Sequence, residues 1–315
     1  MSVNAGAGDA PAGLRLRATL LGHTDSIHRI RWSPSGDVLV SPSRDKTTRF
    51  WKGDVLAGML KDSVGRSIAA AWAPDGQHIA LVADNDILRL WDVTAGESTR
   101  TRSGGLGQVT CIAWAADNSV VATGALKDGV RLWDPEFKNF RALTPKTFDP
   151  VFCLAFAKRG SYLAAGTRTG SIFVWNPDDN KPIHQWPAHP GGVYSLEYCH
   201  TKTQLISSGA DGLIRLWDPL TGKCEGELAA HTAGVNCISP SFDDRLLASK
   251  SSDGTVRLWS LEIEESLVVL AEPAGPTWLP GIAFHPTEAV LATLGQEDQV
   301  IRIWDVDVAA LLGDA

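Results

Sequence analysis

The sequence has little of what disulfide-bonded, metal-binding or membrane-spanning proteins require. Its five cysteines are odd in number and none stands in a CxxC pair, so neither a disulfide framework nor the usual zinc spacing is present. No apolar stretch reaches the roughly 18 residues that a membrane helix needs. We therefore expect no metal or other cofactor and no membrane partner. The unpaired cysteines favour the reducing cytoplasm.

Positive charge is also scarce. The chain carries 29 Lys and Arg against 36 Asp and Glu, which gives a formal net charge of −7. Proteins that bind the phosphates of nucleic acids usually show a basic run or patch. We therefore expect no nucleic-acid partner.

Catalytic motifs are missing from the sequence as well. It contains no glycine-rich phosphate loop, no GxSxG and no HExxH. Most of its acids fall at turns or directly after a tryptophan, and the acidic run from Glu262 to Glu265 reads as a solvated loop. These patterns predict a protein that is not an enzyme.

What the sequence does contain is an internal repeat, the first feature to look for in any chain. Seven tryptophans end short β-like segments and are separated by 40, 42, 42, 42, 42 and 45 residues. A second series precedes each of them by 19 residues, or by 20 in the last unit, with a proline in the sixth slot. The first series is Trp51, Trp91, Trp133, Trp175, Trp217, Trp259 and Trp304, and the second is Trp32, Trp72, Trp114, Phe156, Tyr198, Pro240 and Phe284.

Each unit has the pattern of consecutive antiparallel strands. In TVRLW, Val256 and Leu258 alternate with Arg257, which is the period of two that a strand produces. Asp-Gly pairs at 128–129, 211–212 and 253–254 lie between apolar runs and indicate tight hairpins. We predict a four-stranded meander in every unit and no helix between strands.

These features resemble the WD-repeat β-propeller family, over residues 14–306. Gly22-His23 matches the Gly-His element of that family, and the Trp-Asp element is literal at 91–92, 133–134, 217–218 and 304–305. The resemblance implies an all-β fold, namely a seven-bladed β-propeller of four-stranded antiparallel blades.

The family braces a blade with a hydrogen-bonded set of His, Ser or Thr, Asp and Trp, here called the bracing set. Such a set satisfies a buried indole N–H and a buried carboxylate at the same time. Units two, three, four and seven lack the histidine, so we expect their blades to rely more on apolar packing. Three units carry all four residues: His23, Ser41, Asp45 and Trp51; His189, Ser207, Asp211 and Trp217; His231, Ser249, Asp253 and Trp259.

The ends of the chain are expected to close the ring. Residues 14–20, LRLRATL, precede the first unit and have no blade of their own. We predict that they form the outer strand of the seventh blade, which would remove the free edge of an open sheet. Residues 1–13 then form a flexible tail or linker remnant, residues 14–306 a single propeller, and residues 307–315 a short C-terminal tail.

A partner would dock on loops rather than on the blade framework. Alignment of the units gives three loop slots per unit, and aromatic and arginine residues in them are typical of interface hot spots. The opposite face is expected to be acidic through Asp75, Asp117, Glu136, Asp178, Asp179, Asp243, Asp244 and the 262–265 run, which offers a second surface for a basic partner. The predicted partner-binding residues are His28, Arg44, Arg66, Phe152, Arg168, Tyr194, Asn236 and Trp278.

The sequence therefore predicts a non-catalytic scaffold or sensor module that binds protein or peptide ligands, with a monomer as the default state. Two alternatives stay open. The chain could be the recognition domain of a larger multi-domain or multi-subunit system, or a propeller enzyme with an unorthodox site in its central channel. Two carboxylates facing each other in that channel would favour the enzyme.

Overall fold

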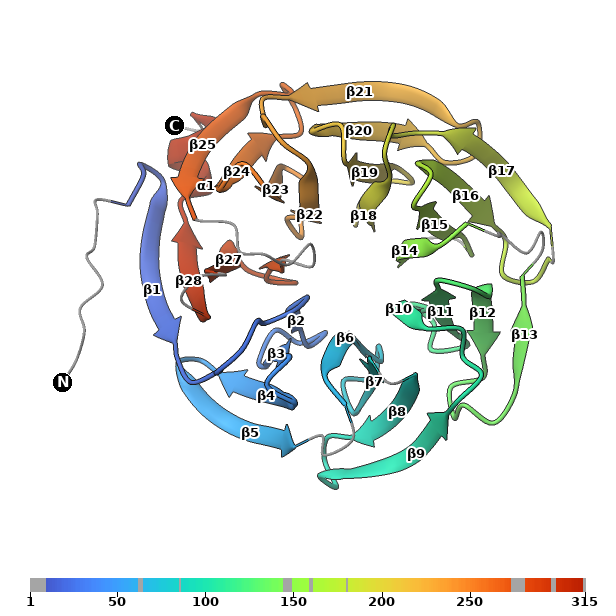
Figure 1. The fold of residues 1–315 in the computed structure, drawn as a ribbon. Coiled ribbons are helices and arrows are strands. Elements are labelled where there is room, and N and C mark those ends of the chain that lie inside the picture. Colours follow the sequence, from blue (N-terminus) through green and yellow to red (C-terminus); the bar gives the residue numbers. More distant parts are fainter. Residues whose placement is uncertain are drawn as a thin grey trace.

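Seven four-stranded antiparallel sheets are arranged as blades around a central axis (Figure 1). The computed structural model describes residues 10–61, 65–84, 86–143, 149–158, 161–179, 181–272, 281–295 and 299–313. Each blade corresponds to one sequence unit, so the predicted seven-bladed propeller is confirmed.

The first four blades follow one another along the chain. Blade one contains β2 (Arg31–Trp32), β3 (Leu39–Pro42), β4 (Thr47–Lys52) and β5 (Val55–Lys61), and blade two contains β6 (Ser67–Trp72), β7 (His78–Ala83), β8 (Ile87–Asp92) and β9 (Glu97–Ser103). Blade three contains β10 (Val109–Trp114), β11 (Val121–Ala125), β12 (Gly129–Trp133) and β13 (Phe140–Ala142), and blade four contains β14 (Val151–Phe156), β15 (Leu163–Thr167), β16 (Ser171–Trp175) and β17 (Pro182–Pro187).

The remaining blades complete the ring. Blade five contains β18 (Val193–Tyr198), β19 (Leu205–Gly209), β20 (Leu213–Asp218) and β21 (Lys223–Ala229), and blade six contains β22 (Val235–Pro240), β23 (Leu246–Ser251), β24 (Thr255–Ser260) and β25 (Ser266–Ala271). Blade seven combines β26 (Ile282–Phe284), β27 (Val290–Gly295) and β28 (Val300–Val306) with β1 (Leu14–Leu20) from the start of the chain.

The pairing of β1 with β28 confirms the predicted closure. Leu14 lies opposite Val306 and Leu20 opposite Ile301, and a bulge interrupts the ladder between Leu16 and Ala18. Asp305 also forms ion pairs of 2.6 Å and 2.5 Å with Arg15 and Arg17. Both edges of the ring are thus joined within one sheet, as Figure 1 shows for β1 and β28.

The segment after β28 is more ordered than a tail. Helix α1 (Val308–Leu312) begins at Asp307, whose carboxylate accepts a hydrogen bond from Ala310 N, and ends at Gly313 with φ +72°. The leucines of α1 pack against the apolar cluster of blade seven. Asp307 N also donates to Gly13 O at 2.9 Å, so the two ends of the propeller contact each other.

The core is divided into layers between blades. Seven apolar clusters are found among the described residues, and each combines side chains from two neighbouring blades. The cluster between blades six and seven, for example, joins Leu246 and Val256 to Leu291 and Trp304. Because every blade is packed on both faces, its strands are buried on both sides and no single blade is stable by itself.

Candidate functional site

The three predicted bracing sets have a consistent hydrogen-bond geometry. In blade one, Trp51 Nε1 donates to Ser41 Oγ at 2.8 Å, Ser41 Oγ lies 2.8 Å from His23 Nε2, and His23 Nδ1 lies 2.6 Å from Asp45. A carboxylate can only accept, so His23 carries its proton on Nδ1 and accepts the serine O–H at Nε2. Blades five and six repeat the arrangement with all distances between 2.7 and 2.8 Å. Every polar group of the set is satisfied in all three.

These networks keep their carboxylates ionised. Burial opposes the charge, but hydrogen bonds from His189 and Arg215 hold the pKa of Asp211 at about 2. Burial likewise opposes the charge of Asp253, while hydrogen bonds from Thr255 and His231 lower its pKa to about 2. The carboxylates of Asp211 and Asp253 are therefore ionised at neutral pH and are held by the hydrogen bonds of their sets.

Blade seven does not rely on apolar packing alone, contrary to the expectation from its missing histidine. Trp304 Nε1 donates to Thr293 Oγ1 at 2.9 Å, and Thr293 Oγ1 donates to Glu272 Oε1 at 2.9 Å. Glu272 also binds Arg302 at 3.1 Å and Lys250 at 3.2 Å. The carboxylate of Glu272 thus replaces the imidazole, and it is only 2% exposed.

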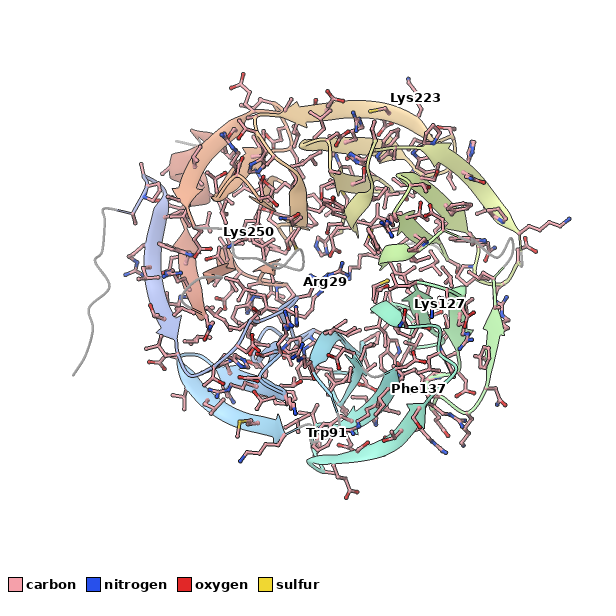
Figure 2. All side chains as sticks on the ribbon, viewed as in Figure 1. Arg29, Trp91, Lys127, Phe137, Lys223 and Lys250 are labelled. Atoms are coloured by element: carbon pink, nitrogen blue, oxygen red, sulfur yellow. The ribbon has the colours of Figure 1, made fainter. Side chains whose placement is uncertain are left out.

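Lys250 is the least expected member of this group. It is fully buried and also donates to the backbone carbonyl of Leu294, so it joins blade six to blade seven (Figure 2). The equivalent strand position in the first five units holds Pro42, Val82, Gly124, Gly166 or Ser208. A lysine among small or apolar residues is therefore the one signal in the sequence that could have indicated this buried charge.

The channel is crossed by two arginines of blade one. Arg29, labelled near the centre of Figure 2, donates to Phe152 O of blade four at 2.9 Å, and Arg31 pairs with Glu197 of blade five at 2.9 Å. A hollow of about 330 Å³ lies beside this second pair, and Glu197 is the single carboxylate among its described lining residues. The pair of facing carboxylates that would have favoured an enzyme is not found in this part of the channel.

At one end of the channel, β-bulges in the inner strands change the direction in which one side chain of each bulged strand points. The ladder between the two inner strands skips one residue in five blades, and that residue is the fourth before the first aromatic: Ile68, Thr110, Phe152, Tyr194 and Asn236. Blade one shows the same shift of one residue in its pairing. The shift lies between the bridge Ile27–Ser43 and the pair Arg31–Val40, in the segment that contains His28. A bulge leaves the extra residue unpaired and bends the strand. We call this end the mouth face.

The hairpin turns belong to the same face. Six backbone hydrogen bonds of 2.9–3.1 Å join the aligned loop slots, one in each of blades one to six. Arg44 N, for instance, donates to Ser26 O, and Arg168 N donates to Pro150 O. The loop positions that the alignment of the units assigned to a binding surface are therefore neighbours in space within each of these blades. The six pairs are Arg44–Ser26, Asp84–Arg66, Leu126–Gln108, Arg168–Pro150, Ala210–Gly192 and Ser252–Gly234.

Phe152 and Tyr194 form an aromatic pair on the mouth face, with ring centroids 6.4 Å apart. A Cβ built on Gly192 or on Gly234 would come within 3.2 Å of the Tyr194 ring, so both glycines leave room for it. The tyrosine is held between two backbone segments, which limits the rotamer freedom that binding would remove.

The other predicted partner-binding residues differ in exposure. Arg66 and Arg168 are exposed and Arg44 is half-buried, so all three can contact a partner. His28 is only 3% exposed and Asn236 only 7%, so neither offers contact area, contrary to our expectation. Asn236 instead donates to Ser252 Oγ at 2.7 Å. Trp278 lies outside the described residues.

His28 is buried without hydrogen-bond partners for either ring nitrogen. Burial, together with the positive charges of Arg44 and Arg29, lowers the pKa of His28 to about 4. The bulge that carries it explains this position, because the strand turns the side chain away from the ladder. His28 is therefore neutral at physiological pH.

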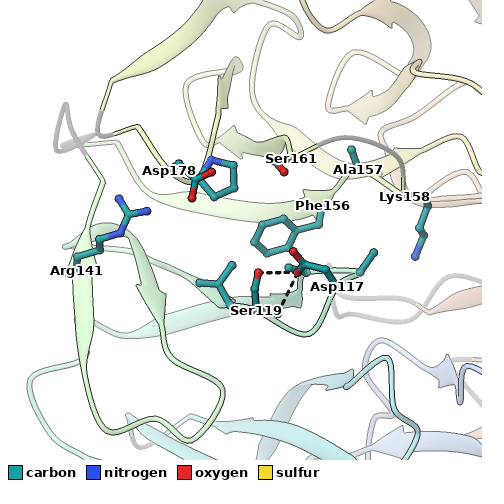
Figure 3. A pocket seen from close by; sticks show the side chains of 12 residues that line it. Asp117, Ser119, Arg141, Phe156, Ala157, Lys158, Ser161 and Asp178 are labelled. Carbon is teal, nitrogen blue, oxygen red and sulfur yellow. Dashed lines mark hydrogen bonds between the residues drawn. The ribbon is translucent and has the colours of Figure 1, made fainter.

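The opposite face carries the turns after the first aromatics and is hollowed between blades. One hollow of about 620 Å³ lies between blades three and four, and one of about 330 Å³ between blades two and three. Of the acids predicted here, Asp244 is 7% exposed and accepts hydrogen bonds from His200 N, Thr201 N and Thr201 Oγ1. It joins blades five and six rather than presenting charge. Asp117 and Asp178 line the larger hollow (Figure 3).

The cysteines and possible metal ligands add no site. All five cysteines are free, and only Cys224 is exposed. Burial raises the pKa of the Cys111 and Cys153 thiols, which keeps them protonated. No group of three His, Cys, Asp or Glu side chains suited to a metal ion was found among the described residues. Likewise, no described helix is long and apolar enough to cross a membrane.

Comparison with known proteins defines the class. The family model described as "WD domain, G-beta repeat" matches residues 14–52, 96–134, 141–176, 180–218 and 222–260, which is more than half of the chain. The chain therefore belongs to the WD-repeat family.

Individual relatives are more distant. Bovine coronin-7 is 40% identical over 78 residues, and THO complex subunit 3 from Arabidopsis thaliana is 36% identical over 78 residues. Both alignments cover 24% of this chain, and they cover 8% and 24% of the two relatives. The β-propeller domain of Cps50 (Swd1) from Myceliophteria thermophila has a TM-score of 0.81 at 18% identity, covering 93% of this chain and 99% of that chain. This last likeness concerns the fold alone.

Proposed function

We propose that this protein is a non-catalytic binding module that receives a protein or peptide ligand at the mouth face. Proteins of this family generally act as protein-interaction scaffolds. The observation that carries the proposal is the ring of bulges, which presents Phe152 and Tyr194 together at the channel entrance. Arg44, Arg66 and Arg168 stand on the neighbouring turns of the same face.

Physical arguments support this surface over the blade framework. Rigid aromatic and arginine side chains dominate binding hot spots because they bury much area and offer directional donors at low entropic cost. Tyr194 is already held by Gly192 and Gly234, so little ordering remains for the ligand to impose. The bracing sets lie between strands and are buried, so they stabilise the blades and do not contact a partner.

The domain limits and compartment belong to the same proposal. We take residues 14–306 as one propeller, with residues 1–13 as a tail and 307–315 as a short C-terminal extension that includes α1. The free cysteines support a location in the cytoplasm. THO complex subunit 3 is by its name a subunit of an assembly, which supports a role for this chain in a multi-subunit system.

The test is affinity capture from native lysate after nuclease treatment, read by mass spectrometry. A variant with Arg44→Ala, Arg168→Ala and Tyr194→Ala is compared with the wild type and with a control carrying Lys61→Ala, Gln185→Ala and Lys223→Ala on the outer strands. We expect a partner that the wild type and the control retain and that the mouth-face variant loses while staying folded. A partner retained equally by all three proteins would move the binding site away from the mouth face.

A further inference from the structure

The outer strand of each blade pairs on one side only, so its other edge is free among the described residues. The unpaired backbone N–H and C=O groups of such an edge can pair with a strand of another chain, and proteins usually oppose this with charged side chains or proline. β5 and β25 lack such residues, except for Lys61 at the end of β5. The other five outer strands carry them: Arg15 and Arg17 in β1; Glu97, Arg100 and Arg102 in β9; Arg141 in β13; Pro182 and Pro187 in β17; Lys223, Glu225 and Glu227 in β21.

Of these two apolar strands, β5 is the more exposed, and it lies on the outer rim of the ring (Figure 1). Val55, Leu56 and Met59 of β5 are 62%, 42% and 39% exposed. In β25, only Val269 belongs to the exposed large apolar side chains. A long apolar strand at an exposed sheet edge is typical of a surface on which another chain docks.

A bulge in β5 decides how this strand can pair with another. Leu56 lies opposite Trp51 and Met59 lies opposite Arg49, with a shift of one residue in the register between these pairs. Residues directly opposite each other share a face of the sheet, and so do Arg49 and Trp51, which are two residues apart in one strand. Leu56 and Met59 therefore point to the same side, although residues three apart in a regular strand point to opposite sides.

Two copies of β5 thus have matching faces when they run antiparallel about a twofold axis. Leu56 of each copy then lies opposite Met59 of the other. The next pair outward is Val55 with Leu60, and both of these point to the second face, as their partners in β4 show. The axis falls at the two small residues in the middle of β5, where there is little side chain to clash.

The two ends of β5 carry opposite charges that this register brings together. Asp54 precedes the strand and Lys61 ends it, and both side chains are exposed. Neither forms an ion pair with a described residue. In the antiparallel register, Asp54 of each copy lies opposite Lys61 of the other, which gives two pairs of opposite charges. β25 offers no such match, since Glu264 and Glu265 precede it and no basic residue ends it.

We propose that two copies of this chain form a dimer by antiparallel pairing of their β5 strands, with Leu56 opposite Met59. Blade one of each copy then contributes its four strands to one continuous sheet. Such an interface uses the same patch on both copies, so it closes at two and does not propagate into a fibre. The contact is limited to one strand and its flanking side chains, so we expect a weak, concentration-dependent dimer.

This inference goes beyond the proposed function, because β5 lies on the outer rim and contributes no residue to the mouth face. The control of the capture experiment contains Lys61→Ala, which removes the charge pairs of the dimer. A partner that this control retains therefore does not depend on those pairs, and the two proposals can fail separately.

The experiment is sedimentation velocity of the full chain over a range of concentrations. For the wild type we expect a sedimentation coefficient that rises from that of a monomer to that of a dimer. Lys61→Asp places like charges opposite each other in both pairs, and the dissociation constant should rise about tenfold. Asp54→Lys combined with Lys61→Asp exchanges the charges and should restore the dimer. The matched control is Lys223→Asp, which makes the same charge change on β21 and should leave the dissociation constant unchanged.

Three results would overturn the proposal, once thermal unfolding has confirmed that each variant is folded. A chain that stays monomeric at every concentration leaves the edge of β5 to a strand of another protein. A dimer that Lys61→Asp does not weaken has its interface elsewhere. A charge exchange that fails to restore the dimer contradicts the register.

Discussion

Blades six and seven support the same tryptophan position by different chemistry. In blade six the imidazole of His231 stands between Ser249 and Asp253, and burial lowers its pKa, so the ring is neutral. In blade seven the carboxylate of Glu272 takes that place and needs two cations, Lys250 and Arg302. Removing one partner of a neutral imidazole lowers stability less than removing one partner of a buried charge does. The two neighbours should therefore respond very differently to substitution.

The largest effect is expected at Glu272. Glu272→Ala leaves Lys250 buried without its carboxylate, which should lower the free energy of unfolding by about 3–5 kcal/mol, the usual range for breaking a buried ion pair. Urea unfolding followed by tryptophan fluorescence measures the change. Replacing both residues, as Lys250→Met with Glu272→Met, should recover a large part of the loss. A double variant as unstable as the single one would mean that the charges are not the reason.

A smaller, pH-dependent effect is expected from the bracing sets of blades five and six. Asp211 and Asp253 have a pKa of about 2, below the value of an unfolded chain, so their contribution is present above about pH 4 and is lost as the pH falls towards 2. Each should contribute roughly 2 kcal/mol, because one pKa unit corresponds to about 1.4 kcal/mol. Stability curves of the wild type and of Asp253→Asn between pH 5 and 2 test this. The variant should be less stable at pH 5 but less sensitive to acid, and parallel curves would contradict the assignment.

The smallest effect is expected in blade three, which has half of the arrangement. Trp133 Nε1 donates to Thr123 Oγ1 at 2.9 Å, while unit three has no histidine to extend the chain. Thr123→Val keeps the shape and removes one acceptor, which should cost about 1 kcal/mol. Chemical denaturation provides the measurement, with Ser249→Ala in blade six as the comparison. Ser249→Ala breaks two bonds and should cost more, so equal losses would argue against the network in blade six.

The repeated aromatics, the turn signals between them and the unassigned segment 14–20 were together enough to predict the blades, the number of strands and the ring closure. They worked because a tryptophan every 42 residues reports a packing requirement that every blade must meet. The sequence pattern did not reveal the charged network of blade seven, because Glu272 lies twelve residues before Phe284 whereas the histidine of the bracing set lies nine before the first aromatic. A contact between residues in different units, such as Lys250 with Glu272, leaves no periodic trace.

The binding surface was predicted only in part. The aligned loop slots do meet on one face, the mouth face, but partner binding there stays a prediction. Exposure depends on neighbours that alignment does not show, and so His28 and Asn236 were wrongly expected to offer contact area.

The pairing of β1 with β28 also has a consequence for the order in which the protein is made. The ribosome releases residues 14–20 before any blade, but the strand that receives them ends at Val306, almost at the end of the described chain. This segment therefore remains unpaired while the ribosome releases the next six blades. Contacts between such distant residues close slowly because a long loop must be ordered before they form. Completion of the ring is thus a late step, and truncated chains lacking β28 should leave β1 exposed to other proteins or to proteases.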